Sequence, residues 1–259
     1  MNSKAIDFYY FTGTGNTLLV ARKMAETFSD SGIEVNFRRI ESSDPADVDL
    51  SHTLGIAFPV ACQSTYLLVW KFLRALPECD GTEVFMVDTM QSFSGAIVGP
   101  LRKVLKKKGY RPIGAKEIVM PGNWFPKRIN EEKNAGKVTR GLDKAAGFAQ
   151  KIVDGSSRWR RVPVLSDGFY WICSRPKTWE MMAKAGEKFT VDVEKCNGCG
   201  ICEKLCPVGN VTAGEPPSFG GSCQQCMRCI SFCPSEAILV PDKEYALYSA
   251  VKVKEILGD

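Results

Sequence analysis

Residues 4–32, KAIDFYYFTGTGNTLLVARKMAETFSDSG, decide the fold of the first part of this 259-residue chain. The stretch opens with an apolar and aromatic run that is typical of a strand. A polar, glycine-containing loop follows, and after it apolar residues recur at steps of three and four: Leu18, Ala21, Ala25 and Phe28. This spacing places them on one face of a helix. The stretch therefore predicts a strand, a loop and a helix, in that order.

Strand and helix patterns keep alternating as far as residue 156. Further strands are expected within residues 34–40, 52–60, 83–90 and 111–120, and further helices within residues 64–77, 97–105 and 135–152. Asp44 and Pro45 are suited to begin a short helical turn between the second and third strands. Because parallel strands need a helical crossover, this alternation predicts an α/β domain with a doubly wound parallel sheet over residues 1–156.

Cysteines dominate the last part of the chain. Of the eleven cysteines, eight lie between Cys196 and Cys233, in two runs that are 27 residues apart. Each run has the spacing C-x2-C-x2-C-x3-C and is followed by a proline, Pro207 or Pro234. Disulfides are disfavoured because the runs follow an α/β pattern without a secretion signal, so we expect metal ligation. The alternative is a pair of structural zinc ions, but zinc ribbons pair two widely separated C-x2-C knuckles, whereas each run here is continuous.

The two cysteine runs resemble those of bacterial two-[4Fe-4S] ferredoxins. In that family the fourth cysteine of each run ligates the cluster of the other run. The resemblance implies one [4Fe-4S] cluster on Cys196, Cys199, Cys202 and Cys233, and a second on Cys223, Cys226, Cys229 and Cys206. It also implies a C-terminal α+β ferredoxin domain over residues 189–259.

The loop between the first strand and the first helix has the chemistry of a phosphate site. It consists of Thr12, Gly13, Thr14, Gly15, Asn16 and Thr17. Unpaired backbone N–H groups and the positive end of the helix favour an anion at such a place, and the hydroxyls add donors. The loop is neither a Walker A loop, which needs a lysine, nor a G-x-G-x-x-G dinucleotide loop. A tight turn that binds nothing is the alternative.

These loop residues resemble the T/S-x-T-G-N-T phosphate loop of flavodoxins. The resemblance implies FMN, a strand order of 2-1-3-4-5 and a flavin ring flanked by the loops after the third and fourth strands. In this chain the ring contacts so implied are Pro59, Val60, Ala61, Thr89, Phe93, Ser94 and Gly95, with Trp124 as a further aromatic neighbour. Taken whole, the chain resembles the fused flavodoxin-ferredoxin proteins known as EFR-type ferrodoxins, with an aromatic-rich connector at residues 157–188.

Charge and composition disfavour several classes of protein. Residues 1–161 carry 24 Lys and Arg against 17 Asp and Glu, but the pI is only 8.6 and no nucleic-acid-binding signature is present. His52 is the only histidine, so zinc sites built from histidines and Ser-His triads are poor candidates, and we expect it simply at a strand entrance. No stretch reaches the roughly 18 apolar residues of a membrane span, and the first residues lack the apolar core of a signal peptide. We therefore expect a cytoplasmic protein.

The two resemblances imply an electron-transfer protein, in which single electrons pass between FMN and two [4Fe-4S] clusters, to or from redox protein partners. The alternative is a flavin-dependent reductase of a small molecule or a protein disulfide that is fed by its own clusters. Cys62, Asn123 and Trp124 are the extra groups for such a reductase, although a free cysteine such as Cys62 is expected to be packed inside. A redox sensor has no dedicated sequence feature, and the oligomeric state stays open.

Overall fold

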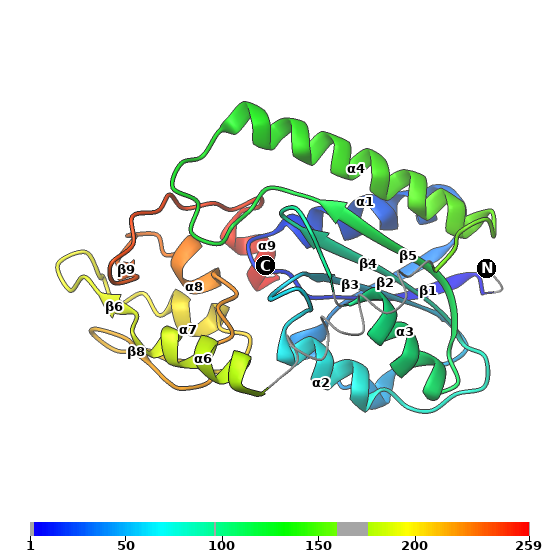
Figure 1. The fold of residues 1–259 in the computed structure, drawn as a ribbon, viewed down its shortest axis with the longest axis horizontal. Coiled ribbons are helices and arrows are strands. Elements are labelled where there is room, and N and C mark those ends of the chain that lie inside the picture. Colours follow the sequence, from blue (N-terminus) through cyan, green and yellow to red (C-terminus); the bar gives the residue numbers. More distant parts are fainter. Residues whose placement is uncertain (1–2, 96, 160–175, 259) are drawn as a thin grey trace. The chain divides into compact units, whose positions relative to one another are not determined.

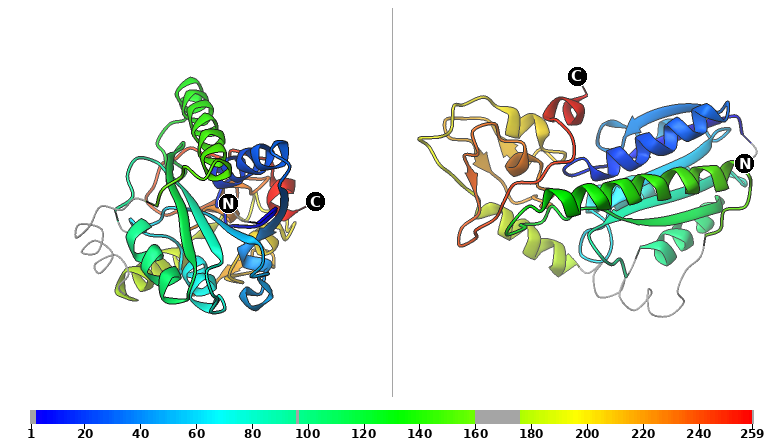
Figure 2. Two further views of the ribbon diagram at one scale, coloured as in Figure 1. Left: turned by 90° about the vertical axis from the view of Figure 1, so that its right-hand side faces the viewer. Right: turned by 90° about the horizontal axis from the view of Figure 1, so that it is seen from above.

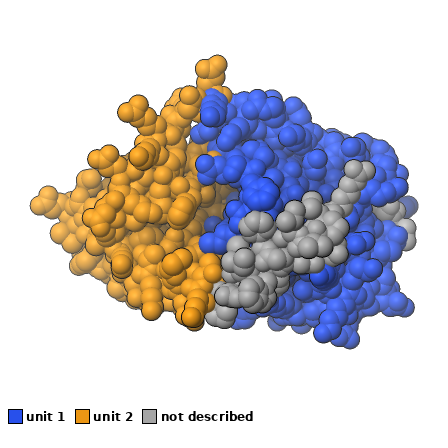
Figure 3. All heavy atoms as spheres, in the orientation of Figure 1, with its two compact units in different colours: residues 1–12, 17–121, 133–174 blue, residues 13–16, 122–132, 175–259 orange. Residues whose placement is uncertain are grey.

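The computed structural model describes residues 3–95, 97–159 and 176–258. The chain divides into two compact units, which Figure 3 distinguishes by colour. Unit 1 comprises residues 1–12, 17–121 and 133–174, and unit 2 comprises residues 13–16, 122–132 and 175–259. Unit 2 thus takes in two segments from the first part of the sequence besides the cysteine-rich part. Of the connector expected at residues 157–188, residues 160–175 lie outside the described part of the chain.

Unit 1 contains a parallel sheet with the strand order β2-β1-β3-β4-β5 (Figure 1). Its strands are β1 Ala5–Tyr10, β2 Glu34–Arg39, β3 Thr53–Pro59, β4 Glu83–Met90 and β5 Arg111–Val119. The order reverses beside β1, so the carboxyl ends of β1 and β3 border the crevice where doubly wound proteins of this order bind their ligands. The predicted α/β class and the predicted order 2-1-3-4-5 are confirmed.

Helices cover both faces of this sheet. They are α1 Asn16–Asp30, α2 Leu67–Ala75, α3 Val98–Lys107 and α4 Glu131–Val153, with the 3-10 turns η1 Ile40–Ser42 and η2 Pro45–Asp47 between β2 and β3. The helices α1 and α4 lie on one face, and α2 and α3 lie on the other (Figures 1 and 2). Each helix follows a strand, as the right-handed crossovers of a parallel sheet require.

Aromatic rings fill the layer between the sheet and the helices α1 and α4. The ring of Phe85 on β4 meets the ring of Phe8 edge-on at 5.3 Å between centroids, and it lies 5.5 Å from Phe28 and 6.5 Å from Phe148. A Cβ atom at Gly55 on β3 would come within 2.6 Å of the Phe85 ring. Because glycine has no side chain, the rings of Phe85 and Phe8 can occupy the space beside Gly55.

The connections before β3 follow the sequence pattern. The Asp44 carboxylate accepts a hydrogen bond of 2.9 Å from the backbone N–H of Ala46, so the predicted cap of the short turn is confirmed. His52 directly precedes β3, as expected, and its Nδ1 lies 3.0 Å from an Asp7 carboxyl oxygen. This hydrogen bond raises the pKa of His52. The single histidine thus has a structural partner at the entrance of a strand.

Unit 2 contains short helices and two small antiparallel sheets, one of β6 and β9 and the other of β7 and β8. In chain order its elements are α6 Pro176–Glu187, β6 Thr190–Val191, α7 Ile201–Leu205, β7 Val211–Thr212, β8 Ser218–Phe219, α8 Arg228–Ser231, β9 Ile238–Leu239 and α9 Val253–Leu257. The core of the unit is formed by Phe189, Met227, Ile230 and Ile238. The predicted α+β character of the C-terminal part is confirmed.

The 27-residue repeat of the cysteines is also a repeat of the backbone. Left-handed residues occur in pairs that are 27 positions apart: Gly198 and Gln225, Gly200 and Met227, Gly209 and Glu236. Gly200 and Met227 have φ angles of 67° and 69°, and each directly precedes a short helix, α7 or α8. Both cysteine runs therefore follow the same turns, although only the first run has glycines at these positions.

None of the helices in the described ranges is long and apolar enough to cross a membrane.

Candidate functional site

Two cavities of unit 2 are lined by the cysteines of the two runs. The wall of the first contains Cys196, Cys199, Cys202 and Cys233, and the wall of the second contains Cys206, Cys223, Cys226 and Cys229. Each cavity thus brings together three cysteines of one run and the last cysteine of the other run. Within the described residues, no three Cys, His, Asp or Glu side chains form a site for a single metal ion. The four-cysteine grouping is the one that the resemblance to two-cluster ferredoxins implies.

Backbone amides hold the last cysteine of each run in its cavity. The N–H of Asn210 donates to Cys206 Sγ at 3.1 Å, and the N–H of Ala237 donates to Cys233 Sγ at 3.4 Å. The two bonds occupy equivalent positions of the repeat, since donor and acceptor both shift by 27 residues. N–H groups that point at sulfur stabilise a thiolate and tune the metal that it binds.

Burial makes several of these thiols poor acids in the absence of a cation. Burial raises the pKa of Cys226 to about 11 and raises the pKa of Cys229 well above its ordinary value. Burial also acts on Cys233, but its hydrogen bonds with Ser235 and the N–H of Ala237 outweigh it, and the net pKa is lowered. A buried thiolate needs a nearby positive charge, which a metal supplies as it displaces the thiol protons.

The loop at residues 12–17 connects β1 to α1, and its hydroxyl-bearing residues are buried. Thr12 and Thr14 are 2% exposed, and Thr17 is 1% exposed. Thr14 Oγ1 has no hydrogen-bond partner among the residues that the structure describes. A buried hydroxyl without a partner is costly and calls for an unseen one. Thr14 therefore fits the predicted role of a donor to a bound phosphate oxygen.

The loops after β3 and β4, which are expected to flank a flavin ring, come together in unit 1. The N–H of Val60 donates to the Thr89 carbonyl oxygen at 2.8 Å. The Thr89 hydroxyl in turn lies 2.7 Å from the hydroxyl of Thr17 at the start of α1. Thr65 closes the first of these loops, because its hydroxyl donates to the Pro59 carbonyl oxygen at 3.0 Å. The structure thus brings Pro59, Val60, Thr89 and Thr17 together.

Cys62 lies at the tip of a tight turn in the loop after β3. Ala61 and Ser64 close this turn with hydrogen bonds of 3.0 and 2.9 Å, and both Cys62 and Gln63 have positive φ angles, 48° and 62°. Cys62 is exposed. The expectation that this cysteine is packed inside was wrong, because Cys62 lies at the tip of a turn whose backbone groups pair with each other, and its side chain is left at the surface.

The remaining predicted ring contacts are distributed over both units. Phe93 in unit 1 is 59% exposed, and the hydroxyl of Ser94, next to Gly95, donates to the Glu117 carboxylate. Trp124 belongs to unit 2 and is 60% exposed, and its Nε1 donates to the side-chain oxygen of Gln225 at 3.3 Å. The contact of each of these aromatic residues with a flavin ring stays a prediction.

Asp88 is a residue that the sequence reasoning missed. It lies on β4, directly before Thr89, and is fully buried. Neither of its carboxyl oxygens has a hydrogen-bond partner within residues 3–95, 97–159 and 176–258. Burial, followed by the charge of Glu117 on the neighbouring strand, raises its pKa well above the ordinary value. The signal in the sequence was an acidic residue inside an otherwise apolar strand.

We expect Asp88→Asn to raise the free energy of unfolding at neutral pH by about 1 to 3 kcal/mol. In the unfolded chain an aspartate ionises above about pH 4, whereas the buried Asp88 resists ionisation. The wild-type protein therefore loses stability as the pH rises from about 4 through the higher pKa of the folded state, and an asparagine removes this loss. Anaerobic denaturant titrations at several pH values measure the effect. Asp30→Asn, on the exposed end of α1, serves as the control, and a gain that is equal at every pH would contradict the explanation.

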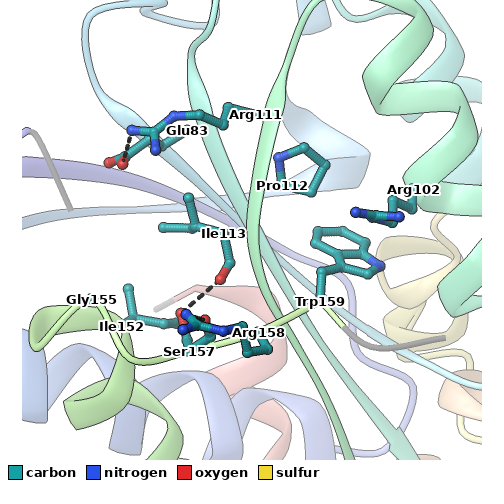
Figure 4. Close-up of a pocket in the computed structure, with 10 residues that line it drawn as sticks. All are labelled: Glu83, Arg102, Arg111, Pro112, Ile113, Ile152, Gly155, Ser157, Arg158 and Trp159. Atoms are coloured by element: carbon teal, nitrogen blue, oxygen red, sulfur yellow. Dashed lines mark hydrogen bonds and ion pairs between the residues drawn. The ribbon is translucent and has the colours of Figure 1, made fainter.

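A cavity of unit 1 lies at the other end of the sheet. It has a volume of about 550 Å³ and is lined in part by Glu83 and Arg111, the first residues of β4 and β5 (Figure 4). The Arg111 guanidinium pairs with Glu83, and the Ser157 hydroxyl donates to the Ile113 carbonyl oxygen at 2.7 Å. None of the predicted site residues is among the described residues that line this cavity. The cavity is therefore separate from the predicted flavin contacts.

The cysteine-rich part of the chain is similar to known iron-sulfur proteins. Residues 189–212 and residues 221–245 each match a family described as a 4Fe-4S binding domain. An uncharacterized ferredoxin of Methanocaldococcus jannaschii is 39% identical over 56 residues, which are 19% of this chain and 73% of that protein.

Solved structures of flavodoxins are similar to part of the chain at low sequence identity. Flavodoxin 2 from Bacillus cereus, in its oxidised form, aligns with a TM-score of 0.46 and 14% identity, over 58% of this chain and 98% of that chain. The two-electron reduced flavodoxin of Megasphaera elsdenii aligns with a TM-score of 0.39 and 19% identity, over 55% of this chain and 98% of that chain.

Proposed function

Because this chain belongs to the ferredoxin family through its C-terminal residues and has a flavodoxin-like fold before them, we propose that it transfers electrons between bound FMN and two [4Fe-4S] clusters. We assign the flavodoxin-like domain to residues 1–156, the connector to residues 157–188 and the ferredoxin domain to residues 189–259.

The observation that carries the proposal is the composition of the two cavities of unit 2. Each is lined by four cysteines, three from one run and the last from the other. Four thiolates around one space are the donor set of a [4Fe-4S] cluster, because thiolates are soft, charged ligands that iron-sulfur clusters prefer. In this proposal Cys196, Cys199, Cys202 and Cys233 hold one cluster, and Cys223, Cys226, Cys229 and Cys206 hold the other.

The protein would contribute by limiting the access of water to the thiolates and by offsetting their negative charge. Cys202 and Cys229 pack against the apolar core of unit 2, which includes Ile230 and Ile238. Apolar packing keeps water from the sulfurs, and the N–H groups directed at Cys206 and Cys233 offset their negative charge. Both effects set the reduction potential of a cluster.

The flavin part of the proposal is supported by the buried, unpartnered hydroxyl of Thr14. Thr12, Gly13, Thr14, Gly15, Asn16 and Thr17 would hold the FMN phosphate, and Pro59, Val60, Ala61, Thr89, Phe93, Ser94, Gly95 and Trp124 would surround the ring. When bound, FMN exchanges one or two electrons and each cluster exchanges one, so the pair can connect one-electron and two-electron redox partners. The partners proposed here are other redox proteins.

The test is the cofactor content of the protein purified without oxygen. We expect about eight irons and eight sulfides per chain, as two cubane clusters require, together with about one FMN released by heat. Zinc in place of iron would contradict the cluster assignment, and the absence of a released flavin would contradict the FMN assignment.

A further inference from the structure

The C-terminal tail, which we define as residues 245–257, forms hydrogen bonds with the phosphate loop inside unit 2. The backbone N–H of Ala250 donates to the Thr14 carbonyl oxygen at 2.7 Å. The Tyr248 hydroxyl donates to Asn16 Oδ1 at 2.8 Å. These residues are more than 230 positions apart in the sequence, and all four belong to unit 2.

The hydroxyl of Tyr248 is suited to donate a hydrogen bond at any physiological pH. Its side chain is 9% exposed, and burial raises the pKa of its hydroxyl to about 12. The hydroxyl therefore keeps its proton at any physiological pH. Because Asn16 Oδ1 accepts the hydrogen bond from Tyr248, the Nδ2 group of the same amide is directed away from Tyr248.

The tail also packs closely against the loop. Gly15 has a φ angle of 105°, a region that side chains rarely adopt, and a Cβ atom there would come within 2.6 Å of the Val251 side chain. The Thr14 carbonyl points toward Ala250, and in a planar trans peptide the following N–H points the opposite way. The bond from Ala250 therefore directs the Gly15 N–H away from the tail.

We propose that Tyr248, Ala250 and Val251 are positioning residues of the phosphate loop, which hold it in the conformation that accepts the FMN phosphate. This inference rests on the proposed function, since it assumes that the loop binds FMN. It assigns a role in flavin binding to the end of the ferredoxin part of the chain. The buried hydroxyl of Thr14, which has no hydrogen-bond partner among the described residues, is the independent sign of a missing ligand.

Flavin titrations of the full chain, with its clusters intact and its flavin removed, test this inference. Fluorescence quenching gives the dissociation constants of FMN and of riboflavin, which lacks the phosphate. We expect Tyr248→Phe to weaken FMN binding by about 3- to 10-fold, since one neutral hydrogen bond is lost, and a truncation after Leu247 to weaken it by more than about 100-fold. Riboflavin binding should change much less, because the contacts proposed for the loop are with the phosphate, which riboflavin lacks.

Tyr245→Phe is the matched control. Tyr245 lies in the same tail, but its hydroxyl donates to the Ile238 carbonyl oxygen at 3.3 Å, away from the phosphate loop. This variant should bind FMN like the wild type, and iron content should be equal in all four proteins.

The outcomes separate the inference from the proposed function. A wild-type chain that binds no FMN overturns the proposed function and the inference with it. A wild-type chain that binds FMN, with unchanged affinity after Tyr248→Phe and after the truncation, overturns the inference alone. An equal loss of FMN and riboflavin binding also overturns it, because the tail would then support the fold in general rather than the phosphate loop.

Discussion

A variant that combines Cys206→Ala with Cys226→Ala is expected to retain about four of the eight irons that the proposed function assigns to the wild-type protein. Both cysteines line the second cavity, so both substitutions remove ligands of the same proposed cluster. The first cavity keeps its complete set, which includes Cys233 from the other run. Anaerobic iron and sulfide analysis measures the outcome.

The matched variant combines Cys206→Ala with Cys196→Ala and is expected to lose nearly all iron, because the two cysteines line different cavities. If each run instead held its own cluster, the results of the two double variants would be exchanged. Cys62→Ala is the control, since this exposed cysteine lies outside both runs and should leave the iron content unchanged. The exchanged pattern would contradict the crossed arrangement.

Thr14→Val is expected to weaken FMN binding by about 10- to 100-fold. A hydrogen bond to a charged group contributes about 1.5 to 3 kcal/mol, and the buried Thr14 hydroxyl has no other partner among the described residues. The same substitution removes an unsatisfied buried hydroxyl, so the flavin-free protein should be at least as stable as the wild type. A loss of affinity without a loss of stability is therefore the specific result.

Thr27→Val provides the comparison for Thr14→Val, because Thr27 lies on α1 and its hydroxyl donates to the Lys23 carbonyl oxygen within the same helix. FMN affinity should stay at the wild-type level in this variant. Fluorescence titration gives the affinity, and anaerobic denaturant unfolding of the flavin-free protein gives the stability. Equal FMN affinities for Thr14→Val and the wild type would refute the role of Thr14.

The elements of both units were predictable because their signals are local. The spacing of Leu18 and Phe28 on α1, the apolar runs of the strands and the Asp44 cap each depend on neighbours within a few residues. Such patterns reflect helix and strand periodicity, which is a property of short windows of sequence. The strand order followed from the resemblance of the loop at residues 12–17 to flavodoxins.

The exposure of Cys62 and the burial of Asp88 were not predictable in the same way. A cysteine is usually buried and an aspartate is usually exposed, and in both cases the environment overrides the preference of the residue type. Cys62 lies on a self-contained turn, whereas Asp88 occupies a central strand with helices on both faces of the sheet. Only the packing around each residue distinguishes these cases.

The amino-acid sequence alone determined the alternation of strands and helices, the two cysteine runs and the loop at residues 12–17, because each is written in contiguous residues. The grouping of the cysteines was implied only by the resemblance to two-cluster ferredoxins, and the tertiary structure brings each group together in one cavity. The tertiary structure alone decided which residues contact the loop at residues 12–17. Cys206 meets Cys223, and Asn16 meets Tyr248, only after the chain has folded back on itself. Contacts of this kind depend on the packing of distant segments, and no local pattern of residue types encodes them.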